Sequence, residues 1–86
     1  MRCMEDFLKA IQKDPRIGIA HIGLYAVLLT FRKSGVIEIC AKEVIPIAKI
    51  GTRSTYYRLI RELDAYGYVR YEPSYDPLKP SRIIQK

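Results

Sequence analysis

The sequence is short of the residues that build metal sites, disulfide frameworks and membrane spans. It has no tryptophan, one histidine, and two cysteines, Cys3 and Cys40, which lie far apart and form no CxxC pair. We therefore expect no zinc site and two free thiols in a reducing compartment. The longest stretch without a charged residue, 17–31, is fifteen residues long. A membrane span needs about 20 apolar residues, so none is expected.

Groups that carry out catalysis or hold a cofactor are also scarce. The five glycines are isolated, which excludes a glycine-rich phosphate loop. His21 has no carboxylate or cysteine at helical spacing, and we expect it at a helix start or at the edge of the core. Glu62 and Asp64 are two residues apart and would point to different sides of a helix. The sequence therefore predicts no enzyme, no cofactor, no metal and no small-molecule ligand.

The length and charge that are present favour one small basic protein. The 86 residues fit a single domain, 1–86, and 49% hydrophobic with 28% charged residues is a globular composition. Fifteen Lys and Arg against nine Asp and Glu give a net charge of +6, which suits an anionic partner. Glu5 and Asp6 interrupt the start of the chain, so we expect no signal peptide and a cytoplasmic location.

The first residues predict an amphipathic helix over 3–13, which Asp14-Pro15 ends. Its apolar residues recur at helical spacing: Met4, Phe7, Leu8 and Ile11. Such a stripe either forms a self-complementary homodimer interface or covers the domain's own core. The sequence leaves both interpretations open.

A second helix is predicted over 19–33. Arg32 and Lys33 would lie in its last turn, where cations are favoured, and Gly35 would stop it. The β-branched run 36–39 then predicts a short strand.

Residues 41–67 have the pattern of a helix-turn-helix unit. Its first helix covers 41–48 and should be short or kinked, because Pro46 removes a backbone donor inside it. Cys40 stands where a Ser or Thr cap is usual. Residues 48–51 form the tight turn.

The second helix of this unit is predicted over 52–66 and ends at Gly67. Thr52 is a good N-cap, because its hydroxyl can accept from the amide near Thr55. At 100° per residue, the apolar residues share one face: Tyr56, Leu59, Ile60 and Leu63. The opposite face carries Ser54, Arg58, Arg61 and Ala65, flanked by Arg53 and Tyr57.

This second face is basic, since no acidic residue occurs between Val44 and Arg61. Arginine can fork onto guanine O6 and N7 or onto phosphate oxygens, and small residues permit close approach to DNA. The face therefore suits the DNA major groove. The plainer alternative is a solvated helix face with scattered arginines.

The end of the chain predicts a hairpin over 68–86, with strands at 68–72 and 82–85. Its loop, 73–81, is rich in proline and contains Tyr75 and Lys79. In a winged helix this hairpin is the wing, and its basic residues would contact the DNA backbone. Tyr75 either contacts the nucleic acid or packs under the hairpin.

Residues 48–72, AKIGTRSTYYRLIRELDAYGYVRYE, resemble the reading-helix segment of bacterial winged helix-turn-helix regulators. The chain as a whole is similar to small proteins of this kind found with bacterial mobile elements, a match carried mostly by 49–51, 66–68 and 73–75. The resemblance implies an α+β fold with a three-helix core, an extra N-terminal helix and a small antiparallel sheet.

These observations together predict a sequence-specific double-stranded DNA-binding protein that regulates transcription. The alternatives are a winged-helix protein-interaction module and an architectural component of a mobile-element DNA complex. The residues expected to contact DNA are Lys49, Thr52, Arg53, Ser54, Tyr57, Arg58, Arg61, Lys79 and Arg82.

Overall fold

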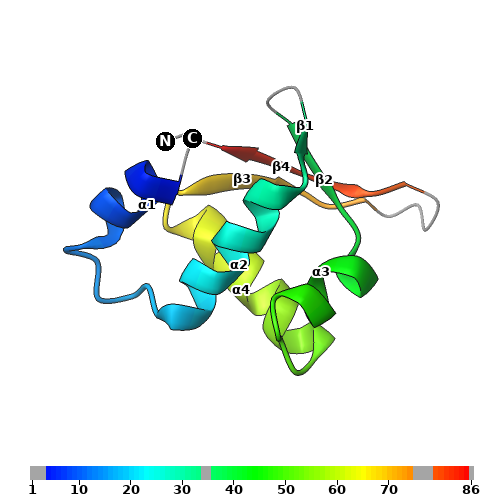
Figure 1. The fold of residues 1–86 in the computed structure, drawn as a ribbon, viewed down its shortest axis with the longest axis horizontal. Coiled ribbons are helices and arrows are strands. Elements are labelled where there is room, and N and C mark those ends of the chain that lie inside the picture. Colours follow the sequence, from blue (N-terminus) through cyan, green and yellow to red (C-terminus); the bar gives the residue numbers. More distant parts are fainter. Residues whose placement is uncertain (1–3, 34–35, 75–78, 86) are drawn as a thin grey trace.

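A computed structural model describes residues 4–33, 36–74 and 79–85. In these residues the chain forms an α+β domain with four helices and a four-stranded antiparallel sheet. The helices lie on one side of the sheet (Figure 1). The sequence-based expectations about Cys3, Gly35 and Tyr75 fall outside the described residues.

The elements follow the predicted order, with one added strand. In chain order they are α1 (Met4–Ile11), α2 (Ile19–Thr30), β1 (Arg32–Lys33), β2 (Val36–Ile39), α3 (Ala41–Ile47), α4 (Arg53–Ala65), β3 (Val69–Glu72) and β4 (Ser81–Gln85). The strands are arranged β1-β2-β4-β3, so that β4 lies between β2 and β3.

The end of the second helix is a correction to the sequence prediction. That helix was expected to continue to Lys33, but α2 ends at Thr30 and Phe31 is its C-cap. Arg32 and Lys33 form β1 instead, pairing with Ile37 and Val36 of β2. The strand pairing satisfies backbone groups that a further helical turn would have satisfied, and this tertiary contact overrides the local helical pattern. The first helix is also shorter than predicted, because residues 12–13 form a turn.

The core lies between the helices and the inner face of the sheet. The apolar stripe of α4 supplies four buried residues, as the wheel predicted: Tyr56, Leu59, Ile60 and Leu63. They join buried residues of α2 and the sheet, among them Leu24, Leu28, Ile37 and Ile83. The burial of this stripe fixes which side of α4 faces away from the core.

The stripe of α1 covers the domain's own core. Phe7 is fully buried, and its ring stacks on Tyr25 of α2 with centroids 3.9 Å apart. The edge of Tyr68 meets the same ring at 5.4 Å. Met4 and Ile11 are partly buried and pack against the hydrophobic core, whereas Leu8 remains 41% exposed.

A Schellman motif ends α3 and places Lys49 in the left-handed region. The amide of Ile50 donates to the carbonyl of Ile45 (3.0 Å), and the amide of Lys49 donates to that of Pro46 (3.4 Å). Lys49 has φ 59°, a conformation in which glycine is usual. The left-handed residue of this turn is thus Lys49 and not the nearby Gly51. The short α3 agrees with the interruption expected at Pro46.

The same motif recurs at the end of α4, here with glycine. The amide of Tyr68 donates to the carbonyl of Leu63 (2.9 Å), and Gly67 takes φ 87°. Further along the chain, in the edge strand β3, the amide of Tyr71 donates to the carboxylate of Asp64 (3.0 Å). These contacts fix the direction in which β3 leaves α4.

The connection between α1 and α2 is attached to the start of β3 through Asp14. Its carboxylate accepts from the guanidinium of Arg16 (2.9 Å) and from the hydroxyl of Tyr68 (2.6 Å). These hydrogen bonds hold the pKa of Asp14 well below its usual range. The bonds from Arg16 have the largest effect, and the bond from Tyr68 adds to it. The Arg16 guanidinium also lies 4.2 Å from the ring centre of Tyr66.

Candidate nucleic-acid interface

The start of α4 is fixed by Thr52, as predicted. Its Oγ1 accepts from the amide of Thr55 (3.2 Å), and its hydroxyl donates to the Thr55 hydroxyl (3.0 Å). This cap satisfies one of the helix's first amides and ends the turn that begins at Lys49. Both Lys49 and Thr52 are exposed.

The outward side of α4 is a polar ridge opposite the buried stripe. Arg53, Ser54, Arg58 and Arg61 are all exposed, and Tyr57 is half-buried. Ser54 and Arg61 lie near the middle of this ridge, because residues seven apart return to almost the same side of a helix. The predicted separation of an apolar and a basic face is therefore present in the fold.

One margin of the ridge is tied to α2 by Glu62. Its Oε1 accepts from Arg58 Nη1 (3.2 Å) and lies 2.9 Å from His21 Nε2. His21 Nδ1 accepts from the amide of Gly18 (3.0 Å), so Nε2 is the nitrogen that carries the proton and donates to Glu62. His21 is buried at the start of α2, which agrees with the helix-start role expected for it.

The other margin of the ridge faces the β3–β4 strand pair. Arg53, Tyr57 and Arg61, spaced four residues apart, line two adjoining hollows along this side of α4. Ser74, which follows β3, and Ser81, which begins β4, line both hollows. Lys79 lines the hollow that contains Arg53. The structure thus brings Lys79 together with two of the predicted α4 residues, Arg53 and Tyr57, and places Arg61 in the adjoining hollow.

Arg82 is placed apart from the ridge. It lies opposite Glu38 on β2 and Glu72 on β3, and directly paired residues share one face of a sheet. Its neighbour Ile83 is buried on the inner face, so Arg82 lies on the outer face, away from α4. There it forms a long ion pair with Glu72 (3.8 Å), with its side chain 52% exposed. Its positive charge is therefore partly compensated within the fold.

Several residues of this region were not singled out from the sequence. Glu62 was considered only as half of a carboxylate pair, and its partner His21 lies 41 residues away. Lys42 of α3 lines the same hollow as Arg53 and Lys79. The sequence does place Lys42 at the start of the helix that follows the strand 36–39. In an antiparallel sheet, the end of that strand lies beside the start of its partner strand, so Lys42 could have been placed near the residues that precede β4.

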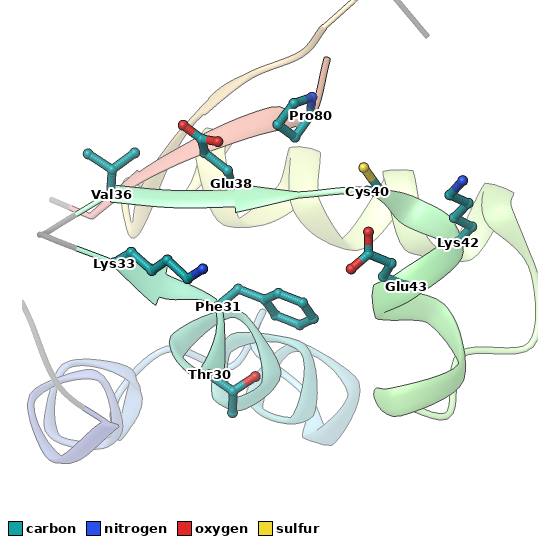
Figure 2. Close-up of a pocket in the computed structure, with 9 residues that line it drawn as sticks. All are labelled: Thr30, Phe31, Lys33, Val36, Glu38, Cys40, Lys42, Glu43 and Pro80. Carbon is teal, nitrogen blue, oxygen red and sulfur yellow. The ribbon is translucent and has the colours of Figure 1, made fainter. Parts of the chain in front are cut away.

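A larger hollow lies on the other side of the β2–α3 junction. It measures about 680 Å³, and its lining comes from α2, β1, β2, α3 and Pro80 (Figure 2). Its charges are mixed, with Lys33 and Lys42 against Glu38 and Glu43. Cys40, half-buried, adds a thiol. This lining does not select a ligand of one charge.

Other classes of site are not seen in the described part of the chain. Residues 4–33, 36–74 and 79–85 contain no group of three or more His, Cys, Asp or Glu that could hold a metal ion. None of the described helices is long and apolar enough to cross a membrane. Comparison with protein-family models, with curated proteins and with solved structures finds no significant match to this chain.

Proposed function

We propose that this protein is a winged helix-turn-helix protein that binds double-stranded DNA and regulates transcription. In this proposal α3 and α4 are the helix-turn-helix unit, and β3 with β4 forms the wing. The observation that carries it is the ridge of α4, which exposes Arg53, Arg58 and Arg61 opposite a fully buried apolar stripe.

The ridge has the chemistry that reads a major groove. Arg61 and Ser54 would approach base edges from its middle, since arginine can fork onto guanine and serine is small enough to permit close contact. Arg58 pairs with Glu62 at 3.2 Å, which partly compensates its charge and limits the orientations that its guanidinium samples before binding. A side chain held in this way loses less conformational entropy when it contacts a base.

The remaining cations would position the protein without reading sequence. Lys49 lies in the turn before α4, and Lys79 lies in the segment that leads into β4, beside α4. Contacts from such residues to phosphates supply affinity that depends on salt concentration. Arg82 would add to this only after exchanging Glu72 for a phosphate.

The decisive experiment replaces Arg61, near the middle of the ridge, and Arg58, at the margin of the ridge that faces α2. Sites should first be selected from a random duplex pool and bound by the wild-type protein. The double variant Arg58→Ala/Arg61→Ala should then lose binding at fixed salt and keep its melting temperature within about 2–4 °C, because both side chains are exposed.

The matched control removes two positive charges from the opposite end of the molecule. Lys9→Ala/Lys13→Ala changes residues of α1 and the turn after it, and should keep most of the wild-type affinity. If the ridge variant binds the selected duplexes as tightly as the wild type, this face of α4 is not the DNA-reading surface.

A winged-helix protein-interaction module or an architectural component of a mobile-element DNA complex is the second candidate. The observation in its favour is Ile47 at the end of α3, which is 54% exposed beside the turn that leads to α4. The salt dependence of duplex binding separates the candidates, because several phosphate contacts give a steep linear fall of log affinity with log salt. No measurable duplex binding at low salt would favour the protein-docking function.

A further inference from the structure

Three positively charged side chains from three different elements line one hollow beside α4. Lys42 comes from α3, Arg53 from α4, and Lys79 from the segment that leads into β4. The hollow measures about 300 Å³ and opens to solvent at its cationic side, where all three residues are exposed. No single motif in the sequence groups these residues.

The sheet register explains why they meet. Ile39 of β2 pairs with Ser81 of β4 in antiparallel fashion. Continuing that alignment along the two chains brings the residues before Ser81, including Lys79, alongside the start of α3. The start of α4 completes the hollow through Arg53 and Tyr57. The proximity of Lys42 and Lys79 therefore follows from the register of β2 and β4.

The hollow has cations but no carboxylate in its lining. Its nine lining residues include no Asp or Glu. Lys42 and Glu43 both line the larger hollow, but the Lys42 ammonium and the Glu43 carboxylate point in different directions (Figure 2), and Glu43 does not line the smaller hollow. Among the described residues, none of the three cations forms an ion pair. Like charges held together without compensation favour an anion between them.

Hydroxyl groups complete the lining. Tyr57, Ser74 and Ser81 line the hollow and carry hydroxyl groups, and the Ser81 Oγ accepts from the Ser74 amide (3.3 Å), which keeps the two chain segments together. A phosphate group is negatively charged and its oxygens accept hydrogen bonds. The ammonium, guanidinium and hydroxyl groups of this lining are donors of the kind that bind such oxygens. We propose that this hollow binds one phosphate group, between Lys42, Arg53 and Lys79.

This inference rests on the proposed function for the source of the phosphate, which would be a phosphodiester of the duplex backbone. The hollow borders the α4 ridge through Arg53 and Tyr57, so a strand whose groove receives α4 would pass beside it. The role is positioning: such a contact adds affinity for every sequence equally and carries no base preference.

The first test measures the salt slope of duplex binding for Lys42→Gln. Lys42 lies outside the proposed base-reading ridge, so the variant should keep the wild-type sequence preference. Loss of one phosphate contact should reduce the slope of log affinity against log salt by about 0.9. Lys13→Gln, with the same charge change on the α1–α2 connection, should leave the slope unchanged. Equal slopes for the two variants would overturn the proposal while duplex binding itself still stands.

The second test uses inorganic phosphate and does not depend on DNA. Titration into the ¹⁵N-labelled wild-type protein should shift the amide signals of Lys42, Ser74 and Ser81, and the shifts should be absent in Lys42→Gln. If phosphate shifts these signals but no duplex binds at low salt, the site is a phosphate site and the proposed DNA function fails. If neither phosphate nor a duplex shifts them, the phosphate site is refuted.

Discussion

At the scale of single residues, Asp14 shows how one carboxylate can join distant parts of a small protein. It accepts from Arg16 and from the Tyr68 hydroxyl, 54 residues along the chain. These donors favour the charged form, which is why the pKa of Asp14 is depressed. The sequence indicated only that Asp14-Pro15 ends a helix, because the identity of a partner so far along the chain is not encoded in local spacing.

The depressed pKa makes a prediction about acid stability. In the unfolded chain the pKa of an aspartate is about 3.9. Because the folded pKa is lower, the stabilisation from Asp14 is fully present above that pH and is lost as pH falls toward the folded pKa. Urea unfolding of Asp14→Asn should therefore show a deficit relative to wild type at pH 6 that shrinks by pH 2.5.

A suitable control is Glu5→Gln, which removes an exposed i,i+4 pair with Lys9. Solvent screens such a pair, so this variant should differ little from wild type at either pH. A deficit of Asp14→Asn that stays constant with pH would show that the carboxylate's charge does not contribute to stability.

At the scale of elements, local pattern predicted most of what lies within one helix or strand. The buried stripe and cap of α4 and the bounds of β2 follow from periodicity and capping, and the structure agrees with them. The predicted end of α2 was wrong, because Arg32 and Lys33 pair with β2, and the periodicity of one segment does not report a contact with another. The hydrogen bond between His21 and Glu62 and the hollow around Lys42 were not predicted either, because both join segments that are far apart in the sequence.

The two Schellman turns give a prediction about backbone strain. Gly67→Ala should destabilise the protein by about 1 kcal/mol, because its φ of 87° is unfavourable with a Cβ. Beyond Gly67 and its two chain neighbours, no atom of the described residues lies within 4 Å of the added Cβ, so the cost comes from the local backbone conformation. Lys49→Gly should stabilise by about 0.5–1 kcal/mol, since it relieves the strain at φ 59° but adds entropy to the unfolded chain.

Urea unfolding measures both changes. Lys49→Ala serves as the control, because it removes the same side chain and keeps the left-handed strain. If Lys49→Gly is no more stable than Lys49→Ala, the turn does not store strain at this residue.

At the scale of the whole molecule, the question left by the first helix was whether its stripe binds a second copy. Burial of Phe7 against Tyr25 and Tyr68 shows that most of the stripe is occupied within the chain. Only Leu8 among its four apolar residues is exposed beyond a third of its surface. Removing α1 altogether would uncover the aromatic cluster, so a deletion cannot test dimerisation cleanly.

Single substitutions in α1 provide the cleaner test. Leu8→Glu should leave both the sedimentation coefficient at micromolar concentration and the melting temperature unchanged. Phe7→Ala should cost about 3–5 kcal/mol, because it empties a fully buried site. A wild-type dimer that Leu8→Glu dissociates would assign the stripe to self-association.

The hydrogen bond between Asp64 and the Tyr71 amide has a consequence for how copies of this protein behave when crowded. An exposed edge strand has unpaired backbone groups that can pair with a strand of a neighbouring molecule and so start a fibril. Asp64 occupies the border at β3, and at the opposite border β1 is only Arg32–Lys33, both charged. We therefore expect the edges formed by β3 and β1 to resist the addition of a strand from a neighbouring molecule at high protein concentration.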